Sequence, residues 1–150
     1  MRCSAGEAAV ERLLTVGHIE RVHGAQADGE SWLERARRGL DAARVLAASA
    51  PDSSVILAYD AARQACVALL AQQGLRPTTA GGHYAIEEVI RAQFAPSLRA
   101  FGGLRRRRNE LEYPLYPTEQ ASAAEAAETL QTAAEIIDSA AKLLPNLSFF

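Results

Sequence analysis

Cysteines and long apolar runs are both scarce in this sequence. Its two cysteines, Cys3 and Cys66, are far apart and show neither metal-ligand spacing nor a disulfide framework. No apolar run approaches the ~18 residues of a membrane span, and the first residues lack the pattern of a signal peptide. These absences predict a cytoplasmic protein with no metal site, no cofactor and no membrane contact.

The net charge of the chain is small, and proline is infrequent. The formal net charge is -2, so any binding of nucleic acid would depend on a local basic patch. Only 6 of the 150 residues are proline, and strong helix formers such as alanine, leucine, glutamate and arginine dominate. The composition and length predict one all-α domain over residues 1–150, an antiparallel up-and-down bundle of four to five main helices.

Apolar residues recur at steps of three and four over several segments, which is the spacing of one helix face. The capping-box pair Ser4 and Glu7 predicts an extra N-terminal helix over residues 5–22. Ser31 is predicted to open the second helix in the same way, and Pro51 to begin the third.

The second half of the chain predicts a shorter helix followed by two longer ones. Pro96 is expected to open a helix that Gly102 and Gly103 interrupt and that Pro114 ends. The last helix is predicted to start at Thr118, as its N-cap, and to run to about residue 144.

Arg108 is unusual because of its place in the apolar pattern. The stripe formed by Phe101 and Leu104 continues, in steps of four and three, to Arg108 and Leu111. A charged residue on an inward seam is costly unless it is paired or has a function. Glu112, one turn further on, can pair with it. Two interpretations stay open: an ion pair that fixes the helix register, or a binding site.

The segment Leu104–Pro114, with the sequence LRRRRNELEYP, resembles the signature segment of HEPN domains, which are small helical bundles. Tyr59–Arg63 and Gly74–Pro77 before His83 also resemble HEPN elements, so the resemblance covers residues 30–145. Active HEPN domains are metal-independent ribonucleases, in which two protomers bring their motifs together across a dimer cleft. The resemblance therefore implies a homodimer that binds RNA or a nucleotide.

The HEPN motif is an arginine, usually followed by a polar residue, with a histidine four to six residues later. By this resemblance Arg108 binds phosphate and Asn109 orients the substrate, whereas Tyr113 stands where the histidine is expected. A tyrosine, with a pKa of ~10, is a poor general base at neutral pH. It can still donate a hydrogen bond or stack on a base. The variant motif is thus compatible with an active site or with a non-catalytic branch of the family.

Further residues are predicted to assist this motif. His83 is a candidate replacement for the missing base, and the alternative is that it caps a helix or packs on Tyr84. Asp60 and Arg63 are candidates to support Arg108 from across the bundle, the alternative being a plain surface pair. Three more side chains are predicted to contact nucleic acid, or otherwise to form a solvated face: Arg105, Arg106 and Arg107.

The leading interpretation is an RNA- or nucleotide-binding HEPN-like protein, and possible activity as a ribonuclease of a toxin–antitoxin or defence-type system follows from the resemblance alone. Its expected partners are a second copy, RNA or a nucleotide, and a cognate antitoxin or nucleotidyltransferase-type protein. The alternative is a non-catalytic dimerisation or protein-interaction module, in which the tail over residues 146–150 docks on a neighbour. A small-molecule pocket between helices is a third interpretation.

Overall fold

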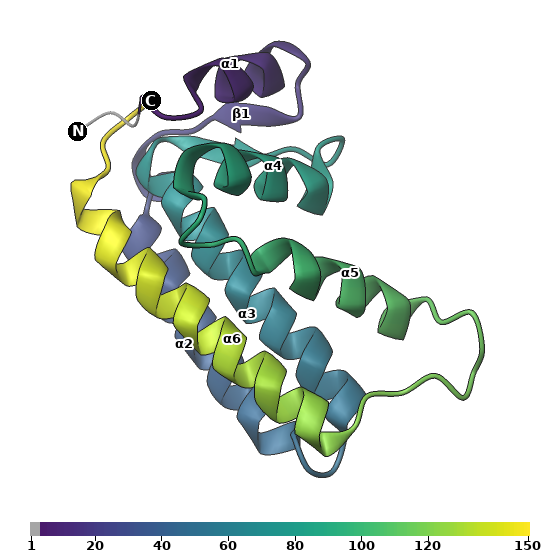
Figure 1. Cartoon of the computed structure of the whole chain (residues 1–150). Helices are drawn as coiled ribbons and strands as arrows, with labels where there is room; N and C mark the ends of the chain where they lie inside the picture. Colours follow the sequence, from purple (N-terminus) through teal and green to yellow (C-terminus); the bar gives the residue numbers. More distant parts are fainter. Residues whose placement is uncertain (1–3) are drawn as a thin grey trace.

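The computed structural model describes residues 4–150, and Cys3 lies outside this range. The described residues form six α-helices, two three-residue strands and two short 3-10 turns (Figure 1). The predicted all-α fold is confirmed. In chain order the elements are α1 (Glu7–Thr15), β1 (Ile19–Arg21), η1 (Gly24–Gln26), α2 (Gly29–Leu46), α3 (Pro51–Gln72), β2 (Leu75–Pro77), α4 (Gly82–Phe94), α5 (Phe101–Glu112), α6 (Ala123–Leu143) and η2 (Leu144–Asn146).

Helices α2, α3 and α6 form the main bundle, with α3 packed against both of the others (Figure 1). α2 and α3 run in opposite directions, α4 lies across the end of α3, and α5 leaves the bundle at an angle before α6 returns along α3. The facing positions of α3 are small and fully buried, including Ala58, Ala62 and Ala65, so the helix axes can approach closely. α3 is long and apolar enough to cross a membrane by length and composition, but 72% of the relevant window is buried inside the fold.

The N-terminal segment differs from the predicted helix over residues 5–22. α1 ends at Thr15 because Gly17 has a φ of 76°, a left-handed conformation that interrupts the helix. The chain then forms β1, which pairs antiparallel with β2 in a register that joins Ile19 to Pro77. The expected cap at Ser4 is also wrong, since Gly6 is the N-cap residue of α1.

Three other helix starts lie away from their predicted positions. Asp28, not Ser31, caps α2 by accepting a hydrogen bond from the Ser31 backbone N–H at 3.0 Å. Ser122, not Thr118, caps α6. α5 begins at Phe101 rather than at Pro96.

The predicted interruption of α5 is also absent, because Gly102 and Gly103 lie in its first turn. A Cβ at Gly102 would come within 2.4 Å of a Glu87 carboxylate oxygen, so this glycine allows α4 and α5 to approach closely.

The C-terminal tail, which was expected to expose its two phenylalanines, packs partly on its own chain. Phe150 is buried, and its backbone N–H donates to the carbonyl of Gln73 at 3.0 Å. Its own carbonyl accepts a hydrogen bond from Arg21 at 2.7 Å. Phe149 remains exposed.

Candidate functional site at the corner of α3, α4 and α5

The four consecutive arginines of α5 extend in different directions and have different partners. Arg105 pairs with Glu87 of α4, whereas the side chain of Arg106 is 66% exposed. The predicted pair between Arg108 and Glu112 is present, with 2.5 Å between Nη2 and Oε2.

Arg107 joins α5 to α6. It contacts Glu125 through two nitrogens, one of them at 3.1 Å, and contacts Glu110 at 2.9 Å. The hydrogen bond with Glu125 is the main reason that the pKa of Arg107 is raised.

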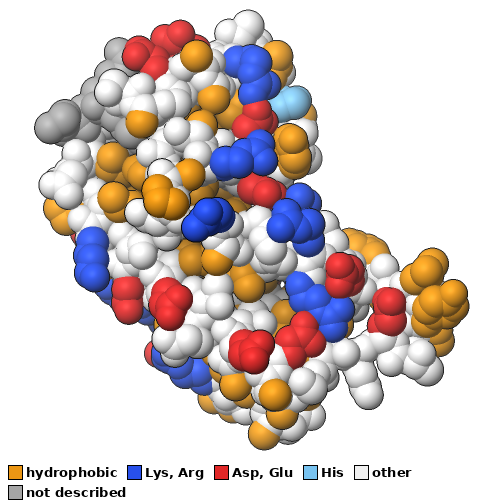
Figure 2. All heavy atoms as spheres, viewed as in Figure 1, with side chains coloured by type: hydrophobic (Ala, Val, Ile, Leu, Met, Phe, Trp, Pro, Cys, Tyr) orange, Lys and Arg blue, Asp and Glu red, His pale blue; other side chains and the backbone are white. Residues whose placement is uncertain are grey.

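These ion pairs reduce the unpaired positive charge that the run of four arginines presents. Lys and Arg side chains alternate with Asp and Glu side chains on the face shown in Figure 2. Arg105 and Arg107 each lie against a glutamate, so the run does not form a continuous unpaired surface. Arg106 is the most exposed of the four, with 3.9 Å between its Nη1 and Oε1 of Glu87, and it fits the expected nucleic-acid contact best.

Tyr59 of α3 is the centre of the corner. Its fully buried ring stacks on Phe101, with centroids 5.6 Å apart, and on His83, with centroids 5.7 Å apart. Its hydroxyl and Nδ1 of His83 are 2.8 Å apart and share a hydrogen bond. The guanidinium carbon of Arg108 lies 5.9 Å from the ring centroid. One tyrosine therefore connects the predicted arginine to the predicted histidine.

Arg63 lies one turn along α3 from Tyr59. Its Nε is 3.5 Å from Asp60 Oδ1, yet this nitrogen is buried and has no hydrogen-bond partner among the described residues. Nε of Arg108 is likewise buried and has no hydrogen-bond partner among these residues. Two arginines around Tyr59 thus carry a buried donor that an added acceptor could satisfy.

The electrostatics of the corner keep His83 neutral. Burial lowers the pKa of His83, and the positive charges of Arg63 and Arg108 lower it further. Burial also raises the pKa of the Tyr59 hydroxyl above its usual range, against the opposing effect of the same two arginines. The corner therefore holds a neutral imidazole and a protonated phenol beside two guanidinium groups at neutral pH.

The family model of the HEPN domain matches residues 30–144, which span α2 to α6 and leave α1 and β1 outside. The chain belongs to the HEPN domain family. No curated protein and no solved structure matches it.

The residues predicted for this HEPN domain are only partly brought together. Asn109 accepts a hydrogen bond from Arg108 at 3.2 Å, so the two motif residues are in contact. Tyr113, at the C-cap of α5, is 73% exposed, whereas His83 lies against Tyr59. The alternatives expected for His83 were a helix cap and a contact with Tyr84. Gly81 is the N-cap residue of α4, and the ring of His83 stacks on Tyr59.

Sequence reasoning did not single out Tyr59 as a functional residue. A usable signal existed, because a tyrosine within an alanine-rich apolar stripe needs a polar partner for its hydroxyl. Within residues 4–150, no three side chains of metal-ligating type come together.

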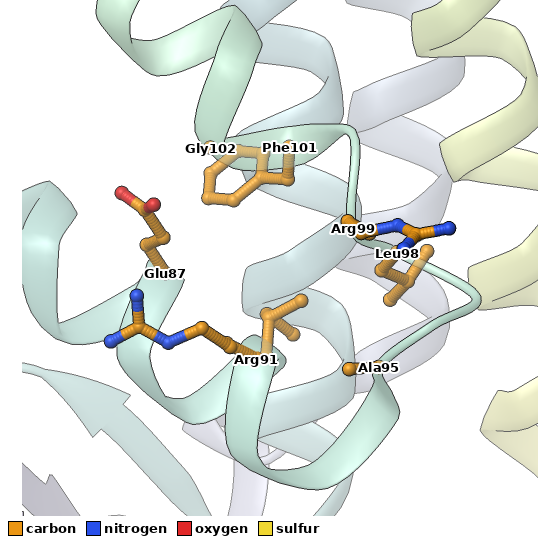
Figure 3. Close-up of a pocket in the computed structure, with 8 residues that line it drawn as sticks. Glu87, Arg91, Ala95, Leu98, Arg99, Phe101 and Gly102 are labelled. Atoms are coloured by element: carbon orange, nitrogen blue, oxygen red, sulfur yellow. The ribbon is translucent and has the colours of Figure 1, made fainter.

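A small cavity of about 140 Å³ lies between α4 and α5 of this HEPN domain. Ile90, Leu98 and Phe101 form its apolar lining, and Figure 3 shows Glu87 and Arg91 beside it on α4. Its volume is close to that of an engineered apolar cavity that holds one benzene ring, and thus too small for a whole nucleotide.

Proposed function

We propose that this HEPN domain binds RNA at the Tyr59 cluster, defined as Tyr59, Arg63, His83 and Arg108, and cleaves it without a metal ion. The observation that carries the proposal is the contact of Tyr59 with both Arg108 and His83. It supplies the phosphate-binding cation and the imidazole that metal-independent cleavage requires, although Tyr113 stands in the motif position of the histidine.

In the proposed reaction, Arg108 binds the scissile phosphate and its charge stabilises the transition state. His83 donates Nδ1–H to the Tyr59 oxygen, so its Nε2 accepts the proton of the ribose 2′-hydroxyl. The 2′-oxygen then bonds to phosphorus while the bond from phosphorus to the 5′-oxygen breaks. The products are a 2′,3′-cyclic phosphate and a 5′-hydroxyl, which takes a proton from water or from the histidine.

Other predicted residues have secondary roles in this proposal. Asn109 orients the substrate, Tyr113 stacks on an unpaired base, and Arg106 contacts the backbone. Glu112 holds the guanidinium of Arg108 in place.

The wider context of the proposal follows from the family resemblance. We infer that residues 1–150 act as a single domain, that the protein is a cytoplasmic homodimer, and that it serves a toxin–antitoxin or defence-type system. A cognate antitoxin or a nucleotidyltransferase-type protein is its proposed regulatory partner.

A second candidate function is a non-catalytic dimerisation or interaction module. It is favoured by the loop after α5, where three large apolar or aromatic side chains are 62–80% exposed: Tyr113, Leu115 and Tyr116. In this alternative the Arg108–Glu112 pair only fixes the end of α5.

The decisive experiment incubates the protein with labelled single-stranded RNA in EDTA and separates the products on a gel. Wild type is compared with Arg108→Ala, His83→Gln and the matched control Arg44→Gln, whose arginine is 54% exposed on α2. We expect cleavage by wild type and by the control only. Cleavage that survives in both site variants would refute the proposed active site.

Absence of cleavage by every form would instead favour the interaction module. Salt-dependent RNA affinity would then separate a non-catalytic RNA binder from a protein-interaction module, because phosphate contacts weaken steeply with salt.

A further inference from the structure

A second hollow lies between η1, α2, α3 and β2, on the side of α3 that continues from the Tyr59 cluster. Its volume is about 410 Å³, within the range of small-molecule sites. We call it the Trp32 pocket. Its main lining residues are Gln26, Trp32, Arg63, Val67, Arg76 and Pro77.

The charged groups that line the Trp32 pocket are both arginines. Arg63 contributes its buried Nε, which has no hydrogen-bond partner within residues 4–150. Arg76 pairs with Glu20 across the two strands at 2.5 Å and is 48% exposed. Each arginine has a carboxylate partner, Asp60 or Glu20, but neither carboxylate is among the lining residues, so the charges that line the pocket itself are both positive. Such a surface favours an anionic group.

The rest of the lining suits a flat aromatic ring. Trp32 is half-buried, and Arg35 lies over its ring with 5.9 Å between the guanidinium carbon and the ring centroid. Arg35 is not among the residues that line the pocket. Val67 and Pro77 add apolar surface, and the exposed Gln26 offers an amide that can donate to and accept from the edge of a base. An indole with an apolar floor and an amide at the rim is a stacking platform.

Arg63 joins the pocket to the Tyr59 cluster. Tyr59, Arg63 and Val67 are spaced by four residues along α3, about 6 Å per step, and therefore follow one face of the helix. The charge of Arg63 acts on His83 and Tyr59, and its side chain lines the pocket. A ligand group bound by Arg63 thus lies next to the proposed cleavage site.

We propose that the Trp32 pocket binds one nucleoside monophosphate unit, with the base stacked on Trp32 and the phosphate bound by Arg63 and Arg76. The unit is either a free nucleotide or one residue of an RNA strand that continues to Arg108. The second source rests on the proposed function, whereas the first does not.

Tryptophan fluorescence tests this directly, because Trp32 is the only tryptophan of the chain. The full-length protein is titrated with AMP, UMP, ribose 5-phosphate, inorganic phosphate and a short single-stranded RNA. We expect saturable quenching by the nucleotides, and no comparable quenching by ribose 5-phosphate or inorganic phosphate, which carry no base to stack.

Variants test the phosphate contacts. Arg63→Gln should weaken nucleotide binding about tenfold or more, since it removes charge-assisted hydrogen bonds. The exposed Arg76→Gln should weaken it several-fold, and serves if the Arg63 variant does not fold. The matched control Arg44→Gln, on the same helix as Trp32, should leave the affinity unchanged.

Arg108→Ala distinguishes the two sources of the ligand, a free nucleotide and a residue of an RNA strand. If RNA binds more tightly than a mononucleotide and only the RNA affinity falls in Arg108→Ala, the unit belongs to an RNA strand. If the mononucleotide binds as tightly as RNA and Arg108→Ala changes neither affinity, a free nucleotide is the ligand, and the proposed RNA site fails independently.

Saturable quenching that neither Arg63→Gln nor Arg76→Gln weakens would overturn the assigned phosphate contacts. No quenching by AMP, UMP or RNA, together with no heat of nucleotide binding by calorimetry, would overturn the pocket itself.

Discussion

The bundle of α2, α3 and α6 and the corner of α3, α4 and α5 use the same central helix in opposite ways. In the bundle, α3 presents small buried residues such as Ala61 and Ala62, which pack without polar contacts. At the corner it presents Tyr59 and Arg63, whose polar atoms need partners. The bundle stabilises the fold through apolar burial, and the corner uses that rigid helix to hold charged and titratable groups together.

The sharpest test of this contrast is a substitution that creates a large cavity in the bundle. Leu69 of α3 is completely buried, so Leu69→Ala should lower the free energy of unfolding by about 2–5 kcal/mol. The measurement is urea unfolding followed by circular dichroism. The control Leu115→Ala removes a side chain that is 80% exposed and should change stability by less than about 0.5 kcal/mol. Equal effects of the two variants would mean that burial in the bundle does not dominate stability.

At the corner a smaller effect is expected, because a hydrogen bond rather than a hydrophobic side chain is removed. Tyr59→Phe keeps the ring stack with Phe101 and deletes the hydroxyl that bonds to His83. It should cost about 0.5–1.5 kcal/mol in the same unfolding assay. A change above about 3 kcal/mol would show that the corner is as important to the fold as the bundle.

The pH dependence of stability should also come from the corner. The pKa of His83 is lowered, first by burial and then by the charges of Arg63 and Arg108, so the unfolded chain binds the proton at higher pH than the folded protein does. The free energy of unfolding should therefore fall as the pH drops below the ordinary histidine pKa of 6.5, and level off below the lowered value.

The free energy of unfolding, measured at about pH 7.5 and at about pH 5.5, checks this prediction. In His83→Gln, which has no imidazole to titrate, the free energy of unfolding should depend less on pH over that interval than in wild type. Arg108→Met should lie between the two, because it removes one of the charges but not the burial. A variant curve parallel to that of wild type would exclude His83 as the source.

Periodicity predicted the bundle well, because helix faces are a local property of the sequence. The same periodicity placed Phe101 and Leu111 on one inward face, and both are buried in α5. Helix starts were less predictable, since several polar residues near each start compete for the cap. Asp28 and Ser122 were each overlooked in favour of a neighbour.

The site was only partly predictable for a different reason. The pair of Arg108 with Glu112 is local, one turn apart on a helix, and followed from spacing. The contact of Tyr59 with His83 joins α3 to α4 across 24 residues, and no helical period encodes it. Arg105, Arg106 and Arg107 looked equivalent in the sequence, yet packing of α5 between α4 and α6 gives each a different environment.

The smallest predicted effects on stability distinguish Arg106 from Arg107. Arg106, 66% exposed, should tolerate replacement by Gln with a change below about 0.5 kcal/mol. Arg107→Gln removes contacts with Glu110 and Glu125, but its side chain is 31% exposed and solvent screens these pairs, so a loss of about 0.5–1 kcal/mol is expected. High salt should reduce the Arg107 effect more than the Arg106 effect, because Arg107 contacts Glu110 and Glu125 at close range, whereas Arg106 is 3.9 Å from Glu87 and 66% exposed. Thermal unfolding of both variants at low and high salt measures this, and an equal response to salt would show that the pairs of Arg107 contribute nothing to holding α5 against α6.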